Sequence, residues 1–139
     1  MNIYFAGSIT GGRADVDLYA HIIAELSKYG EVLTKHVGNK NITKFGDPLP
    51  DKDIYERDLE WLQKADVLVA EVTTPSTGVG YELATIESRG KPVLCLYREL
   101  PDRHLSGLIA GNPNFQFEVY EDVAEVGPIL QKFFGALKD

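Results

Sequence analysis

Glu82 stands on the apolar face of a predicted helix, where the hydrophobic pattern favours alanine or leucine. It shares that face with Val79, Leu83 and Ile86, which recur at helical spacing. Polar residues that interrupt an apolar face concentrate at functional sites. The positive end of the helix dipole would favour the ionised carboxylate of Glu82, and an ionised carboxylate suits a nucleophile. The alternative interpretation is a first-turn glutamate that caps free backbone amides.

Asp58 is the second carboxylate with an inward placement. It lies between Ile54 and Leu62 at i, i+4 spacing on another predicted helix, so its side chain also points toward the core side. The alternative is a boundary residue whose carboxylate reaches solvent or an arginine. Two such carboxylates near donors for a phosphate suggest glycoside chemistry on a nucleotide, because in a retaining glycosidase one carboxylate attacks the anomeric carbon while another group assists departure of the leaving group.

Two loops offer donors that could hold such a phosphate. Residues 7–13 form a glycine-rich turn, whose spacing matches neither GxGxxG nor a Walker motif. Its backbone amides, with Arg13 beside them, could hold a monophosphate, and a plain turn with a solvated arginine is the alternative. Ser76 and Thr77 add hydroxyls and amides at the start of the Glu82 helix, which is a second geometry suited to an anion.

A regular alternation of strands and helices would position these residues. Apolar runs predict strands over residues 2–6, 31–34, 67–70, 91–97 and 115–120, and helical spacing predicts helices with apolar positions over residues 18–29, 54–62, 79–86, 105–109 and 122–137. Residues 36–51 read as a long loop. The alternation predicts an α/β fold in one domain over residues 1–139, a doubly wound five-stranded parallel sheet of the flavodoxin or Rossmann type, with ligands at the carboxyl ends of the strands.

Composition narrows the classes of partner. A net charge of −7 and a pI near 4.9 argue against a nucleic acid polymer as partner but leave a single nucleotide open. The single cysteine, Cys95, lies in an apolar run and predicts a buried thiol in a reducing, cytoplasmic compartment. The three histidines lack metal-ligand spacing, so we expect no zinc site. No apolar stretch reaches membrane-spanning length, so we expect no membrane association.

Five segments of the chain together resemble one enzyme family. They are YFAGSI with GGR over residues 4–13, DLxWL over 58–62, ADxxxAEV over 65–72, PSxGVGYEL over 75–83, and GKP over 90–92. The chain resembles the 2′-deoxynucleoside 5′-phosphate N-hydrolases, which belong to the nucleoside 2-deoxyribosyltransferase superfamily. The resemblance runs in the same order from the first strand to about residue 109, and is weaker over residues 36–53 and after residue 111. It implies the fold of that superfamily.

The resemblance also implies roles for individual residues. Glu82 would be the nucleophile on C1′ of the sugar, Asp58 would hold the sugar hydroxyl and orient or assist Glu82, and Tyr4 would direct its hydroxyl at the same carboxylate. The substrate-binding residues that it implies are Ser76, Gly78 and Arg13 for the 5′-phosphate and Gly7, Ser8 and Ile9 for the nucleobase side. It implies no metal and no organic cofactor.

Ser106 matches a serine that such enzymes lend to the phosphate site of the neighbouring subunit, so the resemblance implies a homodimer. One departure is Thr10, where related hydrolases often carry arginine, and it leaves phosphate affinity and base preference open. The deoxyribosyltransferases typically place an acid six residues before the nucleophile, where this chain has Ser76. A serine hydroxyl can donate to a phosphate that an aspartate would repel.

The expected activity is therefore hydrolysis of 2′-deoxynucleoside 5′-monophosphates to free nucleobase and 2-deoxyribose 5-phosphate. Base exchange by a nucleoside 2-deoxyribosyltransferase and cleavage of ribonucleotides by a CMP-type N-glycosidase are alternative enzymatic functions. A nucleotide-binding module without turnover is the alternative from a different class.

Overall fold

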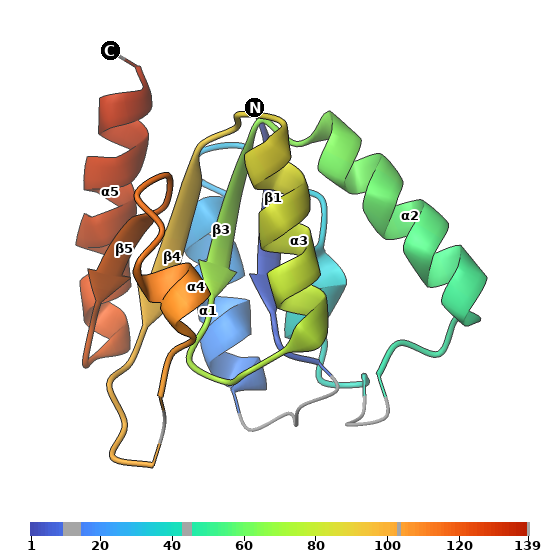
Figure 1. Cartoon of the computed structure of the whole chain (residues 1–139), viewed down its shortest axis with the longest axis horizontal. Coiled ribbons are helices and arrows are strands. Elements are labelled where there is room, and N and C mark those ends of the chain that lie inside the picture. Colours follow the sequence, from blue (N-terminus) through green and yellow to red (C-terminus); the bar gives the residue numbers. More distant parts are fainter. Residues whose placement is uncertain (10–14, 43–45, 103, 139) are drawn as a thin grey trace.

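The computed structural model of the chain describes residues 1–9, 15–42, 46–102 and 104–138. Five strands form one parallel sheet in the order β2-β1-β3-β4-β5, with helices on both faces, so the predicted α/β doubly wound fold is confirmed (Figure 1). The strands are β1 (Asn2–Gly7), β2 (Glu31–Val32), β3 (Val67–Glu71), β4 (Val93–Tyr97) and β5 (Gln116–Val119). The helices are α1 (Val16–Leu26), α2 (Asp51–Lys64), α3 (Thr77–Ser88), α4 (Gly107–Ala110) and α5 (Val126–Leu137), with 3-10 turns η1 (Lys35–Gly38) and η2 (Val123–Glu125).

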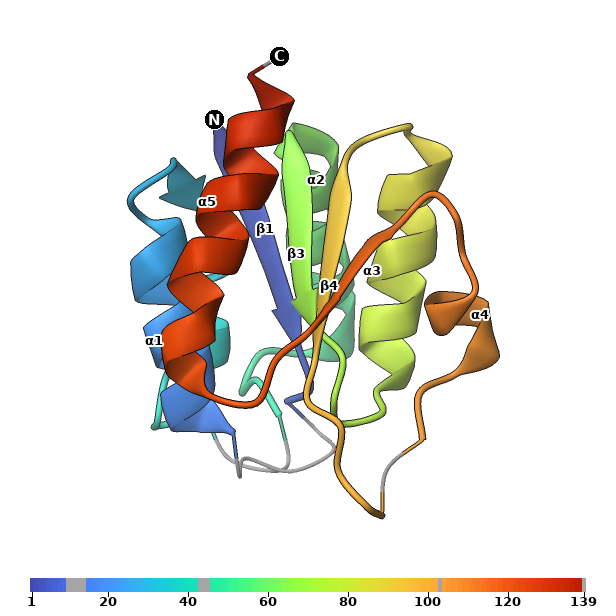
Figure 2. The same cartoon turned by 90° about the vertical axis from the view of Figure 1, so that its left-hand side faces the viewer.

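The sheet separates α1 and α5 on one face from α2 and α3 on the other (Figure 2), and each face packs its own core. Alternate residues of β1 point to opposite faces, so Ile3 and Phe5 pack under α1 and α5, while Tyr4 and Ala6 face α2 and α3. The central strands β1, β3 and β4 are buried almost throughout, because helices cover both of their faces. This alternation places Tyr4 on the same side of the sheet as Asp58 of α2 and Glu82 of α3.

Two segments differ from the sequence prediction. The strand predicted over residues 31–34 ends at Val32, because the Thr34 side chain takes over the pairing with β1: its Oγ1 accepts from Phe5 N at 2.9 Å and donates to Phe5 O at 2.6 Å. The helix predicted over residues 122–137 is a 3-10 turn followed by α5. A capping box between Asp122 and Glu125 starts that turn, and Pro128 then falls in the first turn of α5, where it disrupts no hydrogen bond.

The edge strand β5 is only partly buried. Phe115 and Phe117 pack against the core, and Val119 is 50% exposed. The chain turns at this point so that Tyr120 enters the opposite core. As the edge strand, β5 has a neighbouring strand on one side only, which leaves its end open to solvent.

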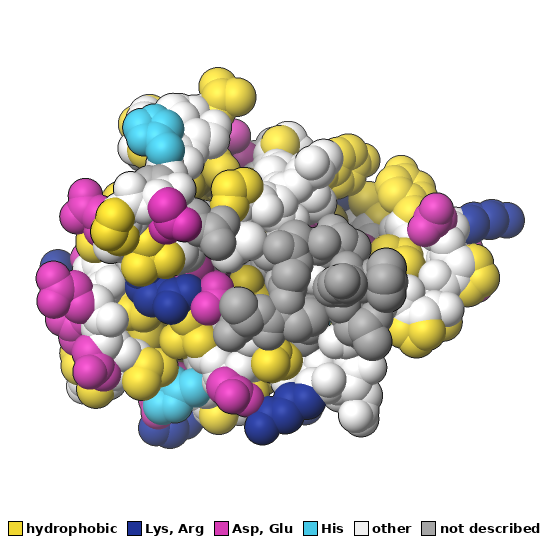
Figure 3. Space-filling view, turned by 90° about the horizontal axis from the view of Figure 1, so that it is seen from below, with side chains coloured by type: hydrophobic (Ala, Val, Ile, Leu, Met, Phe, Trp, Pro, Cys, Tyr) yellow, Lys and Arg dark blue, Asp and Glu magenta, His cyan; other side chains and the backbone are white. Residues whose placement is uncertain are grey.

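The carboxyl ends of the strands lie together at one edge of the sheet (Figure 1). Viewed from that edge, the described acidic and basic side chains are interspersed rather than gathered by sign (Figure 3). Within the described ranges, no helix is both long and apolar enough to span a membrane.

Candidate active site

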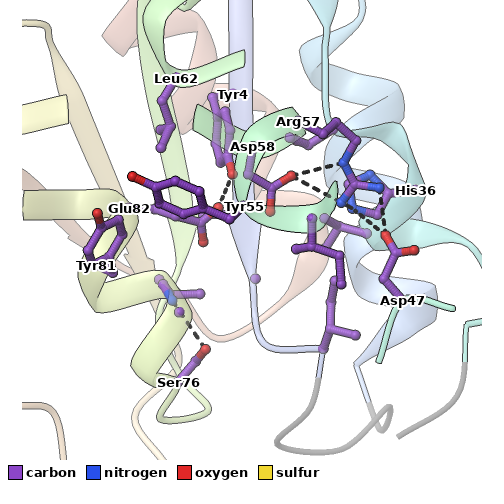
Figure 4. A pocket seen from close by; sticks show the side chains of 18 of the residues that line it. Tyr4, His36, Asp47, Tyr55, Arg57, Asp58, Leu62, Ser76, Tyr81 and Glu82 are labelled. Carbon is purple, nitrogen blue, oxygen red and sulfur yellow. Dashed lines mark hydrogen bonds and ion pairs between the residues drawn. The ribbon is translucent and has the colours of Figure 1, made fainter. Parts of the chain in front are cut away.

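A cleft of about 350 Å³ opens between β1, α2 and α3 toward the carboxyl ends of the strands. It exists because α2 meets the core mainly through Leu62, near its C-terminal end, while the rest of the helix leaves the space beneath it unfilled. Glu82, Tyr4 and Asp58 lie in the middle of this cleft (Figure 4). Ser76 lies at one end, and a cluster centred on Arg57 lies at the other.

Glu82 accepts a hydrogen bond from the Tyr4 hydroxyl at its Oε2. Burial, together with the charge of Asp58, raises the pKa of Glu82 to about 7, although the Tyr4 hydrogen bond and Arg57 act in the opposite direction. Burial and the neighbouring Glu82 raise the pKa of Tyr4 as well, so Tyr4 remains a donor at all working pH values. Burial thus acts against the ionised form of Glu82, which the helix dipole is expected to favour.

Asp58 fulfils both interpretations of its sequence position. Its side chain lines the cleft beside Glu82, and its Oδ1 is also paired with an arginine. Arg57 Nε donates to that oxygen at 3.0 Å, and one terminal nitrogen of Arg57 lies at the same distance from it. The arginine that partners Asp58 is thus its immediate neighbour in α2.

The cluster around Arg57 was not foreseen from the sequence. Arg57 also donates to Asp47 Oδ2 at 2.7 Å and lies 3.3 Å from His36 Nε2, and its guanidinium sits 4.9 Å from the centre of the Trp61 ring. Burial raises the pKa of Asp47, but the hydrogen bonds from Arg57 and Leu49 and the nearby charges of Arg57 and His36 together outweigh burial and hold the pKa below its ordinary value. The only sequence signal was the long loop over residues 36–51, which brings His36 and Asp47 to the cleft.

The opposite end of the cleft is the start of α3. Ser76 is the N-cap, and its Oγ accepts from Val79 N at 3.2 Å. Gly78 lines the cleft, and a Cβ at this position would meet only Ser76 Oγ, at 3.8 Å. A helix start without bulky side chains gives an anion access to the first backbone amides.

Gly7 and Ile9 line the cleft from the end of β1, while Ser8 is buried beside it and is not part of its lining. At Gly7 a Cβ would lie 2.9 Å from Cζ of Tyr19, so the glycine is required by packing against α1. Arg13 and Thr10, predicted or discussed for the phosphate, lie outside the described residues.

Ser106 lies outside the cleft that holds Glu82. It is the N-cap of α4 and accepts from Leu108 N at 3.3 Å. It lines a second cavity of about 470 Å³, on the other side of the start of α3, together with His104 and Thr74. Ser76 borders both cavities, so Ser106 of the same chain stands near the α3 N-terminus without reaching Glu82.

With this geometry in view, comparison with known proteins decides the family. The sequence pattern of the nucleoside 2-deoxyribosyltransferase family matches residues 3–119. The chain belongs to the nucleoside 2-deoxyribosyltransferase family. Within it, the 5-hydroxymethyl-dUMP N-hydrolase of Rattus norvegicus is 47% identical over 139 residues, covering 97% of this chain and 85% of the relative. A putative 2′-deoxynucleoside 5′-phosphate N-hydrolase 1 of Nematostella vectensis is 47% identical over 140 residues, covering 97% and 95%.

A solved structure shares the fold. The CMP N-glycosidase BcmB of Clostridium botulinum superposes with a TM-score of 0.70, over 96% of this chain and 99% of that one, at 18% sequence identity. This confirms the architecture expected from the sequence and carries no information on substrate. The resemblance inferred from the five segments is confirmed by the relatives with N-hydrolase names.

This member of the family also carries a buried polar network that the sequence analysis missed. Glu71, at the end of β3, is fully buried; it accepts from Tyr120 Oη and from Thr73 N at 2.7 Å, and Arg98 Nε lies 3.5 Å from it. Arg98 in turn pairs with Asp15, before α1, at 2.8 Å. The network ties together the ends of β3, β4 and β5, which fixes the loop that leads to Ser76.

Cys95 is buried in the core, as expected, and burial raises the pKa of its thiol to about 12, so it is not a nucleophile. Among the described residues, no group of three or more His, Cys, Asp or Glu side chains is arranged to hold a metal ion.

Proposed function

We propose that this protein hydrolyses the N-glycosidic bond of 2′-deoxynucleoside 5′-monophosphates and releases the nucleobase and 2-deoxyribose 5-phosphate. The observation that carries the proposal is Glu82, which is held by Tyr4 and faces Asp58 inside a cleft that ends at the start of α3. Relatives of nearly the same length, 47% identical, bear the names of hydrolases of this kind. The two-step displacement described next needs no metal and no organic cofactor.

In the first step, the Glu82 carboxylate attacks C1′ while the bond from C1′ to the base nitrogen breaks, and the base leaves with the bonding electrons. Tyr4 donates to Oε2 and thereby leaves Oε1 for the attack. The product is a glycosyl ester of Glu82 and a base that takes up a proton from water. The raised pKa matters here, because a carboxylate poorly stabilised by its surroundings is a better partner for a sugar that develops positive charge.

In the second step, water attacks C1′ from the face that the base has left, and Glu82 departs as a carboxylate. The configuration at C1′ is retained after the two displacements. Asp58 holds the sugar hydroxyl throughout and keeps C1′ aligned with Glu82. A 2′-hydroxyl withdraws electrons from an oxocarbenium-like transition state, so deoxyribose is the easier substrate.

The 5′-phosphate is proposed to bind at the start of α3. There the Ser76 hydroxyl is free to donate, since its oxygen already accepts from Val79 N. The dipole of a helix of 12 residues also favours an anion at this end. Binding energy from the phosphate would orient the sugar over Glu82, so that a substrate without phosphate loses turnover as well as affinity.

A homodimer with shared sites completes the proposal. Ser106 of one subunit would reach the phosphate at the α3 N-terminus of the other, and the neighbouring Leu108, which is 87% exposed, offers apolar surface for that contact. Mixing Glu82→Ala with Ser106→Ala subunits tests this: exchanged dimers should recover activity that neither variant has alone, and no recovery after demonstrated exchange would refute shared sites.

The substrate is tested by incubating the purified protein with each deoxynucleoside monophosphate, including 5-hydroxymethyl-dUMP, and measuring free base by chromatography. Matched nucleosides without phosphate and CMP beside dCMP define the contributions of the phosphate and the 2′-hydroxyl. A second free base in the mixture distinguishes hydrolysis from base exchange by the appearance of a new nucleotide. Absence of base release from the whole panel would refute the proposal.

A further inference from the structure

Arg57 lies at the end of the cleft opposite Ser76, and the proposed chemistry does not use it. Its guanidinium lies between acceptors from three separate segments: Asp58 of α2, Asp47 of the loop before α2, and His36 of η1 (Figure 4). The side chain is only 23% exposed, unlike the other cations of α2, Lys52 and Lys64, which are mostly in solvent. A guanidinium with its donors engaged on three sides has a fixed orientation.

Arg57 fixes the orientation of Asp58. Both Nε and one terminal nitrogen of the guanidinium lie 3.0 Å from the same oxygen, Oδ1. A carboxylate held through one oxygen by a two-point contact keeps its second oxygen, Oδ2, in a defined direction. In the proposed reaction that second oxygen is the one available to the sugar hydroxyl.

Asp47 fixes Arg57 from the other side. Its Oδ2 accepts from a terminal nitrogen of Arg57 at 2.7 Å, and its Oδ1 accepts from the backbone amide of Leu49 at 3.3 Å, so the carboxylate is anchored in its own loop. The ion pairs and hydrogen bonds among the described residues connect Asp47 to Arg57 and His36 but not to Asp58. An influence of Asp47 on Asp58 therefore passes through the guanidinium.

We propose that Arg57 is a positioning residue for the sugar site, and that Asp47 acts on Asp58 only through it. The inference rests on the proposed function, since it assigns Asp58 to the sugar hydroxyl. An ordinary surface ion pair would contribute little and would act on folding alone. If Asp47 instead orients Asp58 through Arg57, an arrangement called the relay below, substitutions at Asp47 and Arg57 should have coupled effects on kcat.

The test is a double-mutant cycle on Arg57→Gln and Asp47→Asn, with kcat and KM measured on the best monophosphate substrate. Arg57→Gln should lower kcat by about 10- to 100-fold, because a small misplacement of a substrate-holding group has effects of this size. KM should rise by no more than about fivefold, since the phosphate end near Ser76 is untouched. Asp47→Asn, which replaces the accepting Oδ2 by a donor, should lower kcat by about 3- to 10-fold.

The double variant decides the relay. If Asp47 acts only through Arg57, the double variant has the kcat of Arg57→Gln within about twofold. Independent effects that multiply would overturn the inference. Arg57→Lys keeps the charge but loses the two-point contact, so its kcat should fall at least about fivefold; wild-type kcat in this variant would also overturn the inference.

Lys64→Gln is the matched control, because it removes a positive charge from the same helix, where Lys64 pairs with Glu60 in solvent. Its kcat should equal that of the wild type. Thermal unfolding of every variant shows whether a fall in kcat follows the folded fraction, which a purely structural role would require.

A binding measurement distinguishes failure of this inference from failure of the proposed function. If the wild type releases no base, the proposed function fails. The double-mutant cycle is then carried out on binding, with the affinity of each protein for 2-deoxyribose 5-phosphate measured by titration calorimetry. Arg57→Gln should weaken that affinity about 3- to 5-fold and leave the affinity for inorganic phosphate within twofold of the wild type. Equal affinities for the sugar phosphate in all four proteins would refute the relay.

Discussion

Glu71 and Glu82 each accept a hydrogen bond from a tyrosine hydroxyl, yet the other groups around the two carboxylates differ. Glu71 lies under α1 and α5, where Tyr120, the amide of Thr73 and the nearby Arg98 compensate its charge. Glu82 lies on the α2 and α3 side, where the Tyr4 hydroxyl is its hydrogen-bond partner and a cleft takes the place of packed side chains. Burial raises the pKa of both carboxyls.

The difference shows how one fold uses the same pairing for two purposes. A buried carboxylate surrounded by donors and a cation is held in place and contributes to the shape of the strand ends. A partly buried carboxylate with one donor and a neighbouring acid retains unfavourable energy that a positively charged transition state can relieve. The comparison therefore predicts that substitutions at Glu82 act on turnover and those at Glu71 act on stability.

The largest expected effect is that of Glu82→Gln on turnover. The amide has the same shape but no nucleophilic oxygen, so base release should fall by at least about 10³-fold. Thermal unfolding at neutral pH should show a stability equal to or above that of the wild type, because a poorly compensated buried charge is removed. Near-normal turnover in this variant would end the assignment of Glu82 as the nucleophile.

Glu71→Ala should have the opposite profile. It leaves Tyr120 and Arg98 without their buried partner, which costs about 3 kcal/mol and lowers the midpoint of thermal unfolding by roughly 10 °C. At a temperature where the variant is folded, kcat should stay within about tenfold of the wild type. A stable Glu71→Ala protein without turnover would mean that Glu71 acts in the chemistry. It would contradict the predicted difference between Glu71 and Glu82.

Tyr4→Phe tests the role of Glu82 through the pH dependence of turnover. The nucleophile must be ionised, so kcat/KM of the wild type should rise as the pH increases through about 7. The Tyr4 hydrogen bond lowers the pKa of Glu82, so its loss should move this rise to higher pH and reduce the rate at pH 7 by about 10-fold. Both proteins are measured on one substrate, so titration of the substrate phosphate affects them equally. An unchanged pH profile in Tyr4→Phe would show that the Tyr4 hydroxyl does not influence the ionisation of Glu82.

The last expected effect is on the pH dependence of stability. Below pH 4.5 Glu82 is protonated in both the folded and the unfolded chain, and between 4.5 and about 7 it is ionised mainly in the unfolded chain. The contribution of Glu82 to stability therefore falls as the pH rises through this window and changes no further above it. The loss is on the order of 3 kcal/mol. Urea unfolding of the wild type and Glu82→Gln at pH 5 and pH 8 measures it: the decline should be smaller in the variant.

The fold could be predicted because its signals are local. Apolar runs of strand length and helical spacing placed all five strands and the helices, and the one-residue alternation of β1 then fixes the face on which Tyr4 lies. Glu82 and Asp58 stood out because each broke an otherwise apolar pattern. These signals require no knowledge of contacts distant in the sequence.

The remaining parts of the site depend on contacts that no local pattern encodes. Asp47 lies in an aperiodic loop ten residues before Arg57, and Glu71 meets Tyr120 across 49 positions of sequence. The direction of the Glu82 pKa shift also depends on how completely neighbouring elements bury it, which a helix dipole argument leaves out. Burial in three dimensions therefore decided both the partners and the charge states.

Gly7 places a limit on how this cleft can diversify. Since a Cβ there would collide with the Tyr19 ring, the end of β1 cannot acquire a larger wall without repacking α1. Evolution toward a differently shaped ligand would have to act through positions whose side chains already line the cleft, such as Ile9 and Tyr55. The end of β1 would then stay unchanged while the side chains around the opening of the cleft varied.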